Sequence, residues 1–208
     1  MSVTQLRARH LQQAIWLEWF TIAYMIFEAV AAIGLGVAAA SASLEAFGFD
    51  SLIELMSASI LLWRLLSEQR NADEERVEQI EQRAARLAGI SLMVLAVYIV
   101  VESLYSLIAS TKPAPTTWGL ALAMLSLLVM PALAKLKLQV ADKISSRALH
   151  ADAIESVACA YLSFTLLLGL GANFLFGWWW ADSLAALVMV YFIAREAKEA
   201  LTPEHDEE

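Results

Sequence analysis

Two acidic residues, Asp50 and Glu54, stand four positions apart inside the apolar stretch of residues 43–55. On an α-helix this spacing places both carboxylates on one face, one turn apart. A charged side chain at the centre of a membrane helix costs about 2.5–3.5 kcal/mol on insertion scales, so an acid in that position is a functional hypothesis by default. The pair predicts a functional site inside a membrane, completed by groups from elsewhere in the chain.

A second pair with the same spacing, Glu155 and Cys159, occurs much later in the chain. Segments 44–64 and 148–172 would cross a membrane in opposite directions, so packing them together would bring both pairs to one depth. Three carboxylates and a thiolate in a tetrahedral array suit a zinc-sized divalent ion. The thiolate favours zinc or cadmium over magnesium, calcium and manganese. The alternative is that the acids are protonated and bond to neighbouring helices, while Cys159 only packs as a small apolar residue.

Four more polar residues could assist such a site. Glu28 falls near the middle of the first apolar segment, and Glu102 falls in the outer half of the third. Each could support a metal ligand, carry a proton, or be a protonated group bonded to a serine. His150 and Asp152 lie a turn or two on the cytoplasmic side of Glu155. They could shape the start of the helix at the interface, or hold a metal ion briefly on its way to the site.

Six apolar segments must position these groups, because a membrane helix needs about 20 mainly apolar residues. The segments are 15–40, 44–64, 86–110, 117–138, 148–172 and 179–200. Hydrophobic residues make up 60% of the chain, against about 45–50% in soluble domains. The sequence predicts an all-α membrane protein: one six-helix domain over residues 15–200, a cytoplasmic segment 1–14 and a short tail 201–208. Asp182 should cap the start of the last helix, outside the site.

The basic residues predict the orientation. If both termini lie on one side, that side receives thirteen lysines and arginines and the other side only Lys112. The positive-inside rule then places both termini in the cytoplasm. The acidic stretch 67–82 is interpreted either as a solvated helical extension or as a surface that collects cations. The single cysteine excludes an internal disulfide.

The sequence resembles the cation diffusion facilitator family, in its short branch that has the transmembrane domain and no cytoplasmic C-terminal domain. Residues 41–54 look like the family's second-helix signature, and residues 151–155 followed by Cys159 look like its fifth-helix signature. Residues 180–187 resemble the start of its sixth helix. Three positions depart from the usual pattern: Glu54 replaces aspartate, Glu155 replaces histidine or aspartate, and Cys159 replaces aspartate.

The resemblance implies a homodimer that exports divalent metal from the cytoplasm in exchange for protons. Zinc is the expected cargo and cadmium the next, with cobalt, iron and manganese as further candidates. No enzymatic activity, resident cofactor or nucleic-acid partner is expected, and a bacterial inner membrane is the expected location. Metal ligands must be deprotonated, so binding trades metal for protons. The expected ligands are Asp50, Glu54, Glu155 and Cys159, with Glu28, Glu102, His150 and Asp152 in support.

Three rival interpretations remain at this stage. A non-transporting membrane scaffold would bind neither zinc nor cadmium. A passive cation channel would conduct without moving protons. A membrane metalloenzyme would want a histidine-bearing site open to water. The three histidines do not fall at the middle of a predicted membrane segment: His10, His150 and His205.

Overall fold

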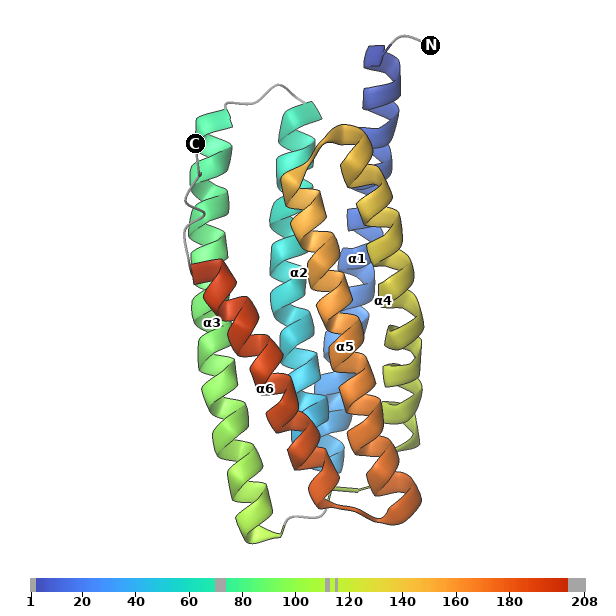
Figure 1. Ribbon diagram of the computed structural model, residues 1–208, viewed down its shortest axis with the longest axis vertical. Helices are drawn as coiled ribbons and strands as arrows, with labels where there is room; N and C mark the ends of the chain where they lie inside the picture. Colours follow the sequence, from blue (N-terminus) through green and yellow to red (C-terminus); the bar gives the residue numbers. More distant parts are fainter. Residues whose placement is uncertain (1–2, 70–73, 111–112, 115, 202–208) are drawn as a thin grey trace.

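The computed structural model describes residues 3–69, 74–110, 113–114 and 116–201, which form an all-helical bundle (Figure 1). Its helices are α1 (Val3–Ala39), α2 (Ala42–Gln69), α3 (Glu74–Ala109), α4 (Thr117–Ile144), α5 (Arg147–Phe176) and α6 (Trp180–Leu201). Strands are absent from these described ranges. The predicted all-α class is therefore confirmed, and each predicted apolar segment forms the body of one helix. The predicted tail beyond residue 201 lies outside the described residues.

Several helices extend past their apolar segments. α1 begins at Val3, α2 continues to Gln69 and α4 continues to Ile144, each with polar or charged residues in the added turns. Arginine, glutamine, lysine and glutamate lose little side-chain freedom in a helix, so these segments continue the helix beyond the apolar part.

Among the described residues, five helices contain stretches long and apolar enough to cross a membrane. These stretches are Leu6–Ala39, Ala42–Gln69, Leu92–Ala109, Thr117–Ile144 and Ala148–Phe176. Their outward faces carry large apolar side chains such as Val30, Ile108 and Leu128, which are 71%, 85% and 73% exposed. Buried carboxylates with an apolar exterior are the arrangement expected for a protein whose solvent is lipid.

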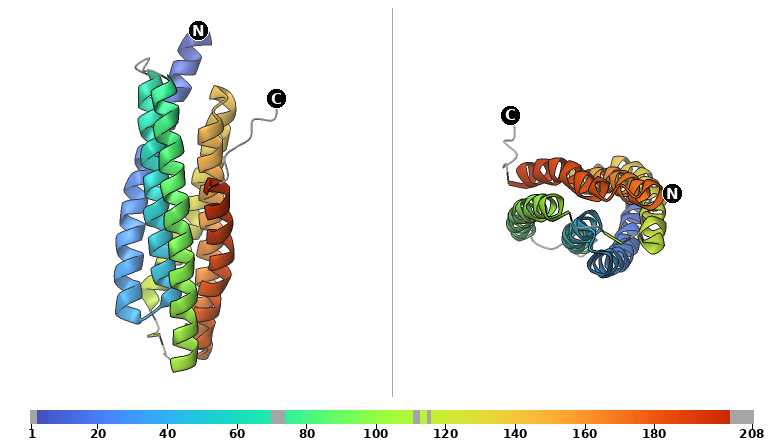
Figure 2. Two further views of the ribbon diagram at one scale, coloured as in Figure 1. Left: turned by 90° about the vertical axis from the view of Figure 1, so that its left-hand side faces the viewer. Right: turned by 90° about the horizontal axis from the view of Figure 1, so that it is seen from below.

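The helices pack in two layers, with α3, α2 and α1 in one and α6, α5 and α4 in the other, as the end-on view of Figure 2 shows. Across the layers, α3 contacts α6, α2 contacts both α5 and α6, and α1 contacts α4. α2 and α5 are therefore the central helices of their layers. α6 runs back toward the end of the bundle where α1 begins (Figure 1).

Close packing of α1 on α2 depends on Gly48. A Cβ atom at this position would stand 2.7 Å from Cγ1 and 2.8 Å from the backbone nitrogen of Ile33. Contacts this short do not occur without a shift of the backbone. Gly48 lies less than one turn from Asp50, so this approach also fixes how near α1 comes to the acids of α2.

Asp182 has a different partner from the one predicted. Its carboxylate accepts hydrogen bonds from the hydroxyls of Ser41 (2.6 Å) and Ser43, and from the Ser43 backbone N–H (3.5 Å). Asp182 therefore supports the start of α2 and not the start of its own helix. The reason is tertiary: the α1–α2 connection presents two serines and a helix N-terminus to the first turn of α6, and a carboxylate is favourable there.

Candidate metal site between the central helices

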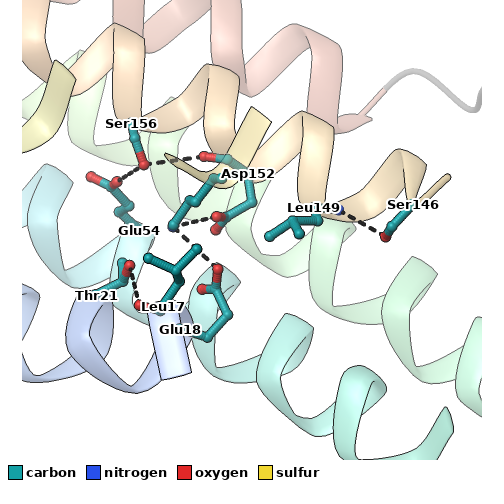
Figure 3. Close-up of polar contacts among 9 residues, drawn as sticks. Leu17, Glu18, Thr21, Glu54, Ser146, Leu149, Asp152 and Ser156 are labelled. Atoms are coloured by element: carbon teal, nitrogen blue, oxygen red, sulfur yellow. Dashed lines mark hydrogen bonds and ion pairs between the residues drawn. The ribbon is translucent and has the colours of Figure 1, made fainter. Parts of the chain in front are cut away.

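Two acids of α2, Asp50 and Glu54, point into the bundle. Asp50 and Glu54 are 6% and 7% exposed. On α5, Cys159 is 1% exposed and Glu155 is half-buried. The hydroxyl of Ser156, next to Glu155, donates a hydrogen bond of 3.4 Å to Glu54 Oε1 (Figure 3). The turns of α2 and α5 that carry the two sequence pairs are therefore at the same level and in contact.

Helix α1 contributes a fourth acid, Glu28, which is fully buried. The Ser51 hydroxyl of α2 donates a 2.9 Å hydrogen bond to Glu28 Oε1, and the Cys159 thiol of α5 lies 3.7 Å from the same oxygen. Glu28 thus joins the predicted set, and we refer to Glu28, Asp50, Glu54, Glu155 and Cys159 as the carboxylate group.

The members of the carboxylate group interact electrostatically. Asp50 is acted on by the charges of Glu28 and Glu155, and Glu54 by those of Asp50 and Glu28. Cys159 in turn interacts with Glu28, Asp50 and Glu54. Negative charges repel one another more strongly in a water-poor interior than in water. Protons or a bound cation would relieve this repulsion, which is the chemistry that the group can perform.

The carboxylate group is not arranged as a closed coordination sphere. Within the described ranges, no three histidine, cysteine, aspartate or glutamate side chains converge closely enough to hold one metal ion. Hydrogen bonds from Ser51 and Ser156 hold Glu28 and Glu54 in their present orientations. Ligation by several members would require these side chains to turn toward one centre. The ligand set Asp50, Glu54, Glu155 and Cys159 therefore stays a prediction.

Comparison with known proteins identifies the family. Residues 17–202 match the family described as "Cation efflux transmembrane domain". The chain belongs to this family. It is thus an integral membrane protein with a cation efflux transmembrane domain, as the resemblance in its sequence implied.

A relative in this comparison is Transmembrane protein 163 of Xenopus laevis. It is 27% identical over 171 residues, which cover 80% of the present chain. The same alignment covers 59% of the frog protein, so the chain spans little more than half the length of this relative.

Two predicted supporting residues of this cation efflux domain lie away from the carboxylate group. Glu102 is half-buried on α3, near the Glu45 carboxylate and the Tyr98 hydroxyl, which share a 3.2 Å hydrogen bond. His150 is exposed on α5. Among the interactions of the described residues, neither Glu102 nor His150 contacts a predicted metal ligand.

Asp152 has a more specific place than the sequence indicated. It is 4% exposed and forms an ion pair with Lys137 of α4, which is fully buried. Glu18 of α1 approaches the same ammonium, with its Oε1 3.4 Å from Lys137 Nζ. Figure 3 shows Glu18 and Asp152 turned toward one another between α1 and α5.

Sequence reasoning missed Glu18 and used Lys137 only as one of the thirteen basic residues counted on the cytoplasmic side. A usable signal was present for each. Glu18 is an acid between the apolar residues of the first segment, and Lys137 is one of two lysines near the end of the fourth. The positive-inside count does not depend on Lys137, because twelve basic residues remain on that side when it is left out.

Proposed function

We propose that this protein exports a divalent metal ion across the membrane, zinc in the first place and cadmium next, in exchange for protons. The observation that carries the proposal is the carboxylate group: buried acids and a thiol from α1, α2 and α5, gathered where the central helices of the two layers meet. In a member of the cation efflux family, a cation is the natural ligand for this group.

The chemistry of the donors supports the choice of metal. Carboxylate oxygens alone would suit magnesium, calcium or manganese as well as zinc. Cys159 adds a sulfur donor, which zinc and cadmium accept more readily. Cobalt and iron are weaker candidates on the same donor set.

The proton exchange follows from the same donors. Carboxylates and a thiol bind metal only after losing their protons, so each metal ion bound releases protons. When the ion leaves toward the outer side, protons neutralise the buried acids, whose charges would otherwise repel one another. Alternating access of the group to the two sides then couples export of metal to import of protons.

The same proposal includes six membrane crossings, with α6 as the last, and both termini in the cytoplasm. The return direction of α6 and the excess of basic residues on the terminal side support this orientation. A homodimer in a bacterial inner membrane completes the proposal, and both parts rest on the family resemblance in the sequence.

The test is metal-driven proton movement in proteoliposomes that contain a pH-sensitive dye. Zinc added to one side should drive dye-reported proton transfer by the wild-type protein. Asp50→Asn, Glu54→Gln and Glu155→Gln should each lower the rate by about tenfold or more, as loss of groups around a metal typically does. Glu68→Gln is the matched control, because Glu68 is an acid of α2 whose side chain is 45% exposed in a surface pair with Arg7.

The rival functions give different results in this assay. Zinc flux without proton movement would identify a passive channel and reject exchange. No flux, together with no zinc or cadmium binding in calorimetry, would identify a non-transporting scaffold. Undiminished transport by Asp50→Asn or Glu155→Gln would reject the carboxylate group as the transport site.

A further inference from the structure

A second buried group of charges lies beside the carboxylate group. Lys137 of α4 is fully buried, and its ammonium is paired with Asp152 of α5 and Glu18 of α1. We call these three residues the lysine cluster. It joins three helices that adjoin one another in the bundle, because α1 contacts α4 and α4 contacts α5.

The lysine cluster lies on the terminal side of the carboxylate group. Asp152 precedes Glu155 by three residues on α5, a rise of about 4.5 Å toward the end of the bundle where α5 begins. Ser156 lies between the two sets, because its hydroxyl is 3.2 Å from the backbone carbonyl oxygen of Asp152 and 3.4 Å from Glu54 Oε1 (Figure 3). The charge of Lys137 also acts on Glu54 and Glu155. Along α5 from the terminal side, the lysine cluster therefore precedes the carboxylate group.

The lysine cluster has more acceptor oxygens than Lys137 uses. Asp152 Oδ1 and Glu18 Oε2 are buried without a hydrogen-bond partner, on side chains that are 4% and 0% exposed. Native proteins rarely leave buried polar atoms unpaired, so such atoms call for a specific reason. Two carboxyl groups also face one ammonium, so a proton or a second cation is needed to neutralise both of them.

We propose that Lys137 is a tethered cation that closes the terminal-side path to the carboxylate group. When its ammonium withdraws, Glu18 and Asp152 form a transient binding pair for the incoming divalent ion. The proposal rests on the proposed function and deepens it, because it assigns the step by which metal reaches the transport site. An ammonium suits this role because it neutralises the carboxylates and donates hydrogen bonds to them without forming coordination bonds. A divalent cation can therefore replace it. The flexible four-carbon stem of lysine allows the displacement.

Cys159 supplies a probe of the path, since it is the only cysteine of the chain and lies one turn beyond Glu155. Its reaction with a membrane-impermeant maleimide can be timed by mass spectrometry in vesicles of either orientation. Lys137→Met leaves Glu18 and Asp152 buried and unpaired. Breaking a buried pair in this way is strongly unfavourable, so water should enter and raise the rate of Cys159 labelling by about tenfold or more. The increase should be found from the terminal side only.

Matched variants separate closure from general loosening. Lys135→Met removes an exposed lysine of the same helix and should label like the wild type. Lys137→Arg keeps the positive charge and should also stay slow. The triple variant Glu18→Gln, Lys137→Met, Asp152→Asn removes all three charges together and should return most of the way to the wild-type rate. An unchanged rate in Lys137→Met would overturn the closing role, as would equal acceleration from both sides or in Lys135→Met.

Transport kinetics test the binding pair. The triple variant Glu18→Gln, Lys137→Met, Asp152→Asn lacks both carboxylates and leaves none of the three charges buried and unpaired. It should raise the zinc concentration for half-maximal transport several-fold while the maximal rate changes little. An unchanged half-maximal concentration would overturn the transient site. If the wild-type protein moves no metal, the proposed function fails and the transient site with it, whereas the labelling rates still decide whether Lys137 closes the path.

Discussion

The Ser51 hydroxyl of α2 donates a 2.9 Å hydrogen bond to Glu28 Oε1 of α1, and this oxygen also lies 3.7 Å from the Cys159 thiol of α5. One carboxylate oxygen thus joins α1 to both helices that carry the sequence pairs. Movement of α1 relative to α2 or α5 would break one of these contacts. Glu28 is therefore placed to connect the charge of the transport site with the arrangement of the helices around it.

Glu28→Gln should weaken zinc binding and proton exchange while preserving the fold. The amide oxygen of glutamine can still accept the Ser51 hydrogen bond, but the negative charge is lost. Loss of a group that supports metal ligands typically lowers affinity by about 10–100-fold. Calorimetry with zinc measures the affinity, and thermal unfolding in detergent checks the fold. Wild-type affinity in Glu28→Gln would show that the group does not need this charge, and Glu68→Gln serves again as the surface control.

Asp182→Ala should destabilise the outer end of the bundle. The variant leaves the buried hydroxyls of Ser41 and Ser43 without their acceptor. Leaving buried polar groups unsatisfied costs about 1–3 kcal/mol. Equilibrium unfolding in mixed micelles gives the free energy of unfolding for Asp182→Ala, Ser43→Ala and the double variant. Strict additivity of the two single effects would show that Asp182 and Ser43 are not energetically coupled.

Gly48→Ala and Gly34→Ala should have opposite effects on stability. A Cβ at Gly48 would meet Ile33 at 2.7 Å, whereas a Cβ at Gly34 has nothing within 4 Å. Overpacking at Gly48 should cost about 1–3 kcal/mol. Alanine at Gly34 should gain up to about 1 kcal/mol from helix propensity. Unfolding midpoints of the two variants measured side by side decide the matter, and equal midpoints would mean that the close α1–α2 approach is not required.

Much of this architecture could be predicted from the sequence, because membrane helices are recognisable from their length and apolar composition. The body of every helix was predicted. The inward orientation of Asp50 and Glu54 was predicted too, because an acidic side chain that faces lipid is energetically costly. The packing of α2 on α5 followed from matching the depths of two residue pairs. The sequence therefore predicts the position of a residue when that position depends only on the residue's own helix.

The partners of the remaining buried polar groups depend on tertiary contacts. Asp182 looked like a cap for its own helix, and only the nearness of Ser41 and Ser43 redirects it. Lys137 lies near the end of an apolar segment, where a lysine usually extends to the interface with its charge in water. It is buried here because Glu18 and Asp152 approach it from two other helices. A single sequence does not reveal that charged side chains from three different helices meet at one point.

Acidification should weaken zinc binding to the wild-type protein. The metal requires deprotonated carboxylates, so protons compete with it, and the apparent affinity falls as pH falls. The expected loss is about tenfold per pH unit for each proton that metal binding releases. Calorimetry at several pH values, in buffers of different ionisation enthalpy, gives both the slope and the number of protons. An affinity that does not change with pH would contradict exchange at these acids.

Cys159→Ser should change the order of metal preference. Serine keeps the small side chain at this buried position but replaces sulfur with a poorly ionised oxygen, which soft metals disfavour. Cadmium affinity should fall most and zinc affinity less, each by about tenfold or more if the thiolate is a ligand, while manganese binding should change little. Competition calorimetry with the three ions measures the order, and thermal unfolding shows whether the variant is folded. Equal losses for all three metals would indicate that Cys159 acts through packing against Glu28, and unchanged affinities would remove it from the ligand set. A selective loss of cadmium and zinc would instead assign the sulfur to the metal and leave Asp50, Glu54 and Glu155 to supply the oxygens.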